Sequence, residues 1–241
     1  MGCKRMENEA RSLKRGPKAL ACVLACTLTA CAPPAVNLPA PGPASAPAAY
    51  TLPAATADWY RGQAGPVLRI DPARSLIVAT VRRGGALARL GHDHVVASHD
   101  IHGLVAPQAG RADFGFRLDQ MIVDEAPLRE QARLDTQPSA DAIAGTRSNM
   151  LSKVLEAERY PEVALRVDGV GDGARLSVTL HGVTRSVAAP VTVTTTAEGI
   201  SASGTLRLRQ SDFGITPMSV MNGAMTVQDA MELRYTIVAR H

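Results

Sequence analysis

The chain has 241 residues and a formal net charge of +4, and its charge distribution argues against nucleic-acid binding. Residues 1–30 hold six of the 26 basic and two of the 22 acidic side chains, so the rest of the chain carries 20 of each and is neutral. Nucleic-acid binding requires a basic face on the folded domain, and we therefore expect no nucleic-acid partner.

The first predicted element is an export signal at 1–30. Six Lys and Arg residues precede an apolar run, ALACVLACTLTA, that is too short to span a bilayer as a helix. The run ends in Leu28-Thr29-Ala30-Cys31, which resembles the lipobox of bacterial lipoproteins. This resemblance implies cleavage before Cys31 and a lipid anchor on Cys31. Cleavage at a nearby site, which would leave a soluble protein, stays open.

By resemblance to other lipoproteins, Ala rather than Asp after the lipidated cysteine implies sorting to the outer membrane. Ala32 occupies this position, so we expect an exported protein anchored at the outer membrane, on its periplasmic face.

A linker is predicted next, over residues 31–66. Pro and Ala dominate APPAVNLPAPGPASAPAAY at 32–50, and such a composition is typical of a semi-extended tether. We place the folded domain at 67–241. All four cysteines precede it, so its own core must stabilise it without a disulfide, a zinc–thiolate site or a cysteine nucleophile.

From Val67 onward, alternation of apolar and polar residues predicts strands at 75–83, 111–118, 174–182, 186–196, 200–209 and 230–240. Turn residues at 169–173, 198–199 and 222–223 separate several of them. In the last strand, one face is predicted to carry Met231, Leu233, Tyr235 and Ile237, and the other Glu232, Arg234 and Thr236. The fold class is therefore all-β and antiparallel, either a barrel or a sandwich.

One region between about 124 and 160 breaks this alternation. SNMLSKVLEAERYPEV at 148–163 has helical spacing, with Ser148 placed to cap the start and Tyr160-Pro161 to end the helix. DEAPLREQAR at 124–133 predicts a second, weaker helix. We expect a short helical insertion in the sheet.

Three pieces of the second half resemble the YceI-like family of exported bacterial proteins. They are Tyr160-Pro161-Glu162-Val163, Leu180-His181-Gly182-Val183-Thr184-Arg185 and Ser211-Asp212-Phe213-Gly214-Ile215, in the family's order and at about its spacing. The likeness covers about residues 67–240. It implies an eight-stranded antiparallel lipocalin-like β-barrel around an apolar tunnel that binds a long isoprenoid lipid, either a polyprenyl chain or a quinone.

A histidine cluster is the strongest candidate for a site, and it comprises His92, His94, His99 and His102. On an extended strand His92 and His94 share a face, roughly 7 Å apart at about 3.3 Å per residue, and could ligate one metal. A turn at Ser98-His99-Asp100 could bring His102 back to them, and a three-histidine site suits zinc or copper. Two other interpretations stay open: exposed residues at the mouth of the barrel, or a donor from His92 or His94 to a quinone or phosphate head group.

The predicted function is storage or transport of an isoprenoid lipid or quinone in the bacterial envelope. No G-x-S-x-G elbow or phosphate loop is present, so we predict no enzyme and assign no catalytic residue. Two alternatives remain: a metal-binding envelope protein or metal-dependent enzyme that uses the histidine cluster, and a structural or stress-related protein with a filled core. An oligomer is also compatible with the sequence.

Overall fold

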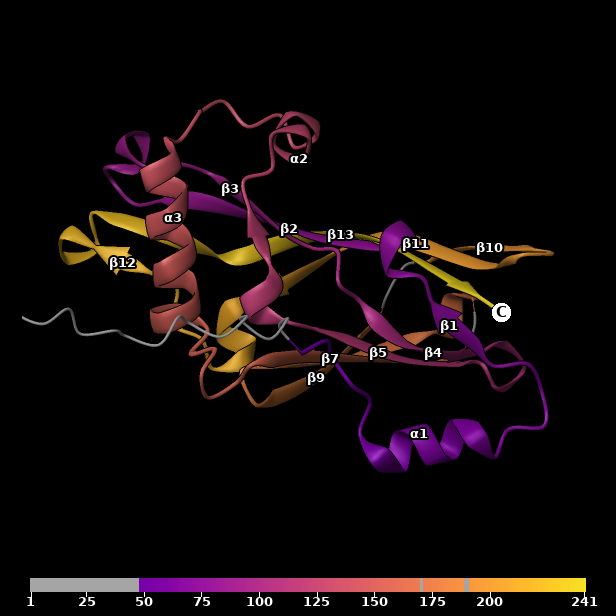
Figure 1. The fold of residues 1–241 in the computed structure, drawn as a ribbon. Coiled ribbons are helices and arrows are strands. Elements are labelled where there is room, and N and C mark those ends of the chain that lie inside the picture. Colours follow the sequence, from indigo (N-terminus) through magenta and orange to yellow (C-terminus); the bar gives the residue numbers. More distant parts are fainter. Residues whose placement is uncertain (1–47, 170, 189–190) are drawn as a thin grey trace, which may run out of the picture. The chain divides into compact units, whose positions relative to one another are not determined.

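Thirteen strands form one antiparallel sheet in the computed structural model, which describes residues 48–169, 171–188 and 191–241 (Figure 1). The expected export signal and Cys31 lie outside these residues. In chain order the strands are β1 (Leu68–Ile70), β2 (Leu76–Gly84), β3 (His94–Ser98), β4 (His102–Ala106), β5 (Arg111–Arg117), β6 (Ile122–Val123), β7 (Glu162–Asp168), β8 (Arg175–Leu180), β9 (Val183–Ala188), β10 (Thr192–Thr196), β11 (Gly199–Arg209), β12 (Ser219–Val220) and β13 (Met225–Arg240).

The longest strand, β13, organises the sheet. One of its edges pairs with β11, from Gly199 opposite Arg240 to Arg209 opposite Ala230. Its other edge pairs with β2 and, further along, with β1. Strands β3 and β6 continue from β2, whereas β4, β5, β7, β8 and β9 continue from β1. Three branches of the sheet therefore meet at β13: one through β2, one through β1, and one formed by β11 and β10.

This arrangement differs from the closed eight-stranded barrel that we expected. Among the described residues, no ladder joins β9 to β10 or β11, so the sheet is open. The sheet has more than the eight expected strands because turns divide long strands into shorter ones. The 3-10 turn Pro72–Arg74 separates β1 from β2, and residues 99–101 separate β3 from β4. Pro72 has no N–H to continue a ladder.

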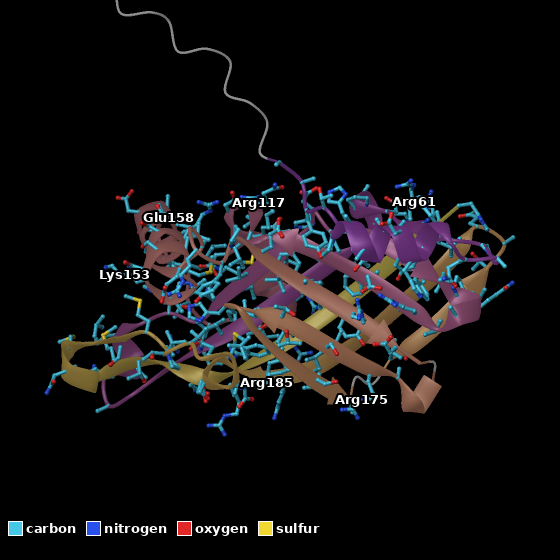
Figure 2. All side chains as sticks on the ribbon, turned by 90° about the horizontal axis from the view of Figure 1, so that it is seen from below. Arg61, Arg117, Lys153, Glu158, Arg175 and Arg185 are labelled. Carbon is cyan, nitrogen blue, oxygen red and sulfur yellow. The ribbon has the colours of Figure 1, made fainter. Side chains whose placement is uncertain are left out.

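Alternation along the strands is confirmed. Glu232, Arg234 and Thr236 of β13 are exposed, and the residues between them face the interior. On β8 and β9, Arg175 and Arg185 point outward in Figure 2. The strand predicted at 186–196 is two strands, β9 and β10, with residues 189–190 between them outside the described ranges.

The helical insertion is present with different bounds. Helix α2 (Ala126–Gln131) confirms the weaker prediction, and α3 (Ala140–Asn149) runs into a π-helical turn, η5 (Met150–Val154). The predicted cap at Ser148 is wrong: the side chain of Ser139 accepts a hydrogen bond from the N–H of Ala142 at 3.2 Å. The start of α3 contains small side chains without apolar periodicity, so the sequence pattern gave no sign of it. In the ranges described above, no helix is both long enough and apolar enough to cross a membrane.

Residues 48–66 belong to the same compact unit as the sheet, so the linker that we expected over 31–66 ends earlier. Helix α1 (Ala54–Arg61) lies in this segment, and its Tyr60 donates a hydrogen bond to Asp113 on β5 at 2.9 Å. Tyr50 covers Gly115, where an added Cβ would come within 2.5 Å of the tyrosine ring. This N-terminal strap therefore packs on the outer face of β5.

A buried carboxylate holds the strap. Burial alone would raise the pKa of Asp113, but hydrogen bonds from Arg111, Arg166 and Tyr60 outweigh it and lower the pKa. Both arginine Nε atoms lie 2.7 Å from the carboxylate. Asp113 is therefore a charged anchor between the strap and the sheet.

Candidate functional site

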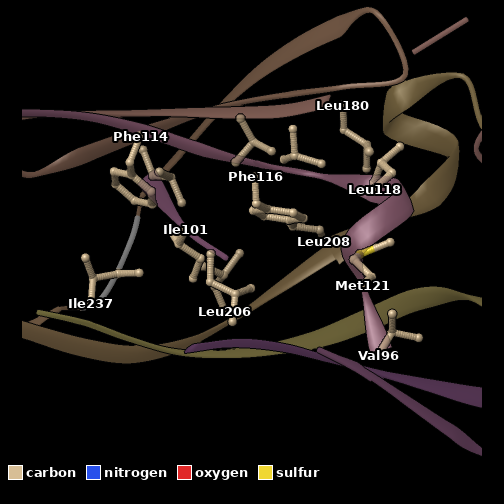
Figure 3. Close-up of a cluster of buried hydrophobic side chains, with 14 of the residues drawn as sticks. Val96, Ile101, Phe114, Phe116, Leu118, Met121, Leu180, Leu206, Leu208 and Ile237 are labelled. Atoms are coloured by element: carbon tan, nitrogen blue, oxygen red, sulfur yellow. The ribbon is translucent and has the colours of Figure 1, made fainter. Parts of the chain in front are cut away.

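An apolar cavity of about 840 Å³ lies against the inner face of the sheet. Its wall is mainly aliphatic because the positions that alternate inward along the strands are Val, Leu, Ile, Ala and Met. Figure 3 shows part of the surrounding core, which includes Val96, Ile101, Phe114, Phe116, Leu118, Met121, Leu180, Leu206, Leu208 and Ile237. The four β13 residues predicted to share one face, Met231, Leu233, Tyr235 and Ile237, all line the cavity.

The low aromatic content explains why the interior keeps this space. Only 3% of the chain is aromatic, and the Phe and Tyr residues that line the cavity are Phe114, Phe116 and Tyr235. Aliphatic side chains cover the wall without filling the centre. The filled core that we held open as an alternative is therefore not what the structure has.

The helical insertion supplies another part of the wall. Thr146 and Asn149 of α3, and Met150 and Val154 of η5, line the cavity, followed by Leu155. Met150 and Val154 belong to the stretch at 148–163 predicted to be helical, and their spacing of four residues places them on one helical face. The insertion therefore packs that face toward the interior.

The structure keeps His92 and His94 close together but does not bring His102 back to them. Strands β3 and β4 do not pair with each other: β3 pairs with β2 and β6, and β4 pairs with β1 and β5. The hairpin proposed at Ser98-His99-Asp100 is therefore wrong, and the chain continues past it instead of reversing. Extended chain advances about 3.3 Å per residue, which moves His102 away from His94.

Three of the histidines pair with separate carboxylates. His94 Nδ1 lies 2.6 Å from Asp124, His99 Nε2 lies 2.8 Å from Glu125, and His102 Nε2 lies 2.6 Å from Asp100. The rings of His92 and His94 have centroids 6.1 Å apart and are tilted by 60°.

The zinc or copper interpretation receives no support from this geometry. No group of three or more His, Cys, Asp or Glu side chains in the described part of the chain could hold a metal ion.

His94 is the one member of the cluster that lines the cavity. Its partner Asp124 has a fully buried side chain, which also accepts hydrogen bonds from the N–H of Val95 at 3.1 Å and from Arg129 at 2.5 Å. Burial alone would raise the pKa of Asp124, but the bonds from His94, Val95 and Arg129 outweigh it and lower the pKa. The carboxylate is charged and holds the imidazole in one orientation.

Sequence reasoning missed Asp124 and Ser98 as site residues. Asp124 was expected in a helix, but it has a φ of 60°, which Asp adopts more readily than most residues. Ser98 lines the cavity, and its Oγ is buried without a hydrogen-bond partner. The sequence signal that could have identified Ser98 is its spacing, because residues 94, 96 and 98 share one face of an extended strand.

The antiparallel sheet, the short helical insertion and the apolar cavity fit the lipocalin-like class of β proteins. The chain belongs to the YceI-like family, because the model of the YceI-like domain matches residues 69–239, more than half of the chain. This match confirms the resemblance found in the sequence. No protein of curated function matches the sequence.

Several chains of solved structures are similar to this one. One is described as a polyisoprenoid binding domain from Saccharophagus degradans implicated in plant cell wall breakdown, with a TM-score of 0.50 and 11% identity over 72% of this chain and 97% of that one. Another is BcnA from Burkholderia cenocepacia, with a TM-score of 0.47 and 14% identity over 70% of this chain and 98% of that one. At 11% identity, the first likeness concerns the fold.

Proposed function

We propose that the chain binds an extended apolar lipid, a polyisoprenoid or an isoprenoid quinone, in the cavity on the inner face of its sheet. The cavity itself carries this proposal: about 840 Å³ of space behind a mainly aliphatic wall. Such a space suits a hydrocarbon chain, because each Å² of apolar surface removed from water contributes roughly 25 cal/mol.

The cavity volume sets a scale for the length of chain that it can cover. At roughly 30 Å³ per heavy atom, the share of one water molecule in the liquid, about 840 Å³ corresponds to about 28 heavy atoms, or between about five and six isoprene units. Part of the stabilisation is offset by the ordering of a flexible chain on binding. Lipids of about this length should therefore fit best.

Family membership and the polyisoprenoid-binding description of one similar structure support the isoprenoid class. The wall itself supports binding over catalysis, because aliphatic carbon neither transfers protons nor attacks a substrate. We therefore assign the cavity a role in lipid storage or transport and assign it no catalytic residue.

The setting that we propose is the bacterial envelope. The apolar run at 19–30 and the lipobox-like Leu28-Thr29-Ala30-Cys31 support export and an anchor on Cys31. Ala32 supports sorting to the outer membrane, and we place the domain on the periplasmic face. A tethered carrier of this kind would keep an insoluble lipid close to the membrane.

The test is to purify the chain from the exported fraction, extract it with organic solvent and identify the released lipid by mass spectrometry. We expect a polyprenyl lipid or an isoprenoid quinone at about one per chain. Only fatty acids or phospholipids in the extract would contradict the isoprenoid assignment. Stoichiometric zinc or copper, lost in a His92→Ala/His94→Ala variant, would instead favour the metal-binding alternative.

A further inference from the structure

Strand β3 places polar groups on the mainly aliphatic wall of the cavity. Alternate residues of this strand, His94, Val96 and Ser98, line the cavity. The residues between them, Val95 and Ala97, are buried in a separate apolar cluster under α2. Since His94 is the first residue of β3 and follows the loop from β2, it marks the loop end of this wall.

His94 is held in place more firmly than a surface histidine. Its Nδ1 lies 2.6 Å from the carboxylate of Asp124, whose side chain is fully buried. Asp124 is itself fixed by the N–H of Val95 and by Arg129. The guanidinium of Arg129 also donates to the carbonyl of Asp93 at 2.8 Å. Bracing of this kind orients an imidazole and fixes which nitrogen carries the proton.

The orientation leaves Nε2 as the atom that His94 can offer to a ligand. Nδ1 is committed to Asp124, and no other group in the described ranges hydrogen-bonds to the ring. The side chain is 16% exposed and belongs to the cavity wall, and Nε2 is its polar atom without a hydrogen-bond partner in the described ranges.

We propose that His94 Nε2 hydrogen-bonds to a hydroxyl head group of the bound lipid while the isoprenoid tail extends along the aliphatic wall. A hydroxyl both donates and accepts, so it can bond to Nε2 whether or not the ring is protonated there, whereas a carbonyl can only accept. The inference rests on the proposed function and specifies the head group that the same cavity takes.

The charges around the site argue against a phosphate head group. Arg129 is paired with Asp124, and Arg82 contacts Asp93. Arg83 contacts Asp93 as well and also pairs with Asp135 at 2.8 Å, so three carboxylates face the three arginines. A buried phosphate would need a cation to compensate its charge, and these three arginines already have carboxylate partners. A neutral head group avoids this cost.

Ser98 is the competing candidate for the same role. Its Oγ is buried, lines the cavity and has no hydrogen-bond partner in the described part of the protein. It lies four residues along β3 from His94, about 13 Å at 3.3 Å per residue, so one hydroxyl cannot bond to both. We favour His94 because Asp124 fixes its direction.

The experiment uses competition between lipids with one tail of five isoprene units. The full chain in detergent is equilibrated with an equimolar mixture of the prenol, the hydrocarbon without its hydroxyl, the prenyl monophosphate, and the quinone in reduced or oxidised form. The protein is then captured and washed, and its lipids are extracted and quantified. The variants are His94→Leu, Ser98→Ala and, as a matched control, His92→Leu, because His92 is close to His94 but does not line the cavity.

We expect the wild-type chain to enrich hydroxyl lipids over the hydrocarbon about tenfold, the effect of one net hydrogen bond. Comparison of prenol with reduced quinone shows which hydroxyl the site takes. The enrichment should fall to about one in His94→Leu and persist in His92→Leu. Enrichment that persists in His94→Leu, is lost in Ser98→Ala, or favours the phosphate or oxidised quinone would overturn the head-group assignment.

Failure of the proposed function has a different signature. Retention of all the lipids without preference would overturn the head-group assignment alone, whereas retention of none would overturn the lipid-binding proposal as well. If His94→Leu does not fold, the test is the ¹⁵N NMR resonance of His94 Nε2 in the wild-type chain, with and without lipid. This resonance is assigned as the one that is absent from the spectrum of His94→Gln. It should shift with prenol and stay unchanged with the hydrocarbon, and equal shifts would contradict the hydrogen bond.

Discussion

Replacement of Ala202 by Trp should shorten the lipid that the chain retains. Ala202 lies on the cavity face of β11. The substitution adds about nine heavy atoms, which at roughly 30 Å³ each remove about 270 Å³, close to a third of the 840 Å³ cavity. This volume corresponds to about two isoprene units. At about 0.8 kcal/mol per buried CH₂, a tail that loses one unit from the cavity loses up to about 4 kcal/mol.

The assay is the distribution of chain lengths retained from a mixture of prenols, measured by extraction and mass spectrometry. Ala202→Trp should shift the preferred length down by one to two units and weaken retention of the longest prenols at least about 100-fold. The new ring fills empty space and gains contacts, so we expect little change in Tm. The matched control is Ser203→Trp, the next residue, which faces away from the cavity. An unchanged length profile in Ala202→Trp would refute binding in the cavity.

Three further predictions concern the buried charges. Arg129→Met removes the guanidinium that pairs with the buried Asp124 carboxylate and should lower the free energy of unfolding by about 3–5 kcal/mol, measured by urea titration. The control is Arg207→Met, at an exposed ion pair, which should change the free energy of unfolding by less than about 1 kcal/mol. Equal losses would contradict the buried network. The pKa values of Asp113 and Asp124 are lower in the folded state, so the folded state binds fewer protons than the unfolded state at acidic pH. The stability that these two carboxylates contribute is therefore complete above the unfolded pKa of about 3.9 and should be lost as pH falls through the lower folded pKa values. Stability measured between pH 2 and 6 that does not rise with pH would contradict this. Tyr60→Phe should lower the free energy of unfolding by about 1.5 kcal/mol, because it removes a hydrogen bond to the charged Asp113. An unchanged free energy of unfolding would mean that this contact of the strap contributes little to stability.

Alternation predicted β8, β11 and β13, because more buried residues alternate with more exposed ones along much of each strand. The inward residues of β13 were identified for this reason, and they line the cavity. The first half was harder to predict. Strand β3 is buried on both faces from Val95 to Ser98, so the apolar–polar alternation that marks a half-buried strand is weak there.

The N-terminal strap was missed for a different reason. Its Pro- and Ala-rich surroundings are typical of a tether, and the contacts that retain it are made by Tyr50 and Tyr60 with residues of β5. These are long-range contacts that local composition does not encode. The same limit applies to closure of the sheet, which depends on how β9 and β10 are arranged in space.

The histidine spacing identified the right neighbourhood but not the arrangement. His94 lies at the cavity as one of the expected candidates, whereas His99 and His102 pair with Glu125 and Asp100. The partner that defines His94 is Asp124, 30 residues further along the chain. Only the pairing of β3 with β6 brings these two residues together.

The most direct test of the central claim is native mass spectrometry of the chain purified from the exported fraction. We predict an additional mass of several hundred daltons, corresponding to one isoprenoid lipid, that disappears on organic extraction and is shorter or absent in Ala202→Trp. Bare protein at the sequence mass, or a bound lipid that is identical in Ala202→Trp, would contradict the account.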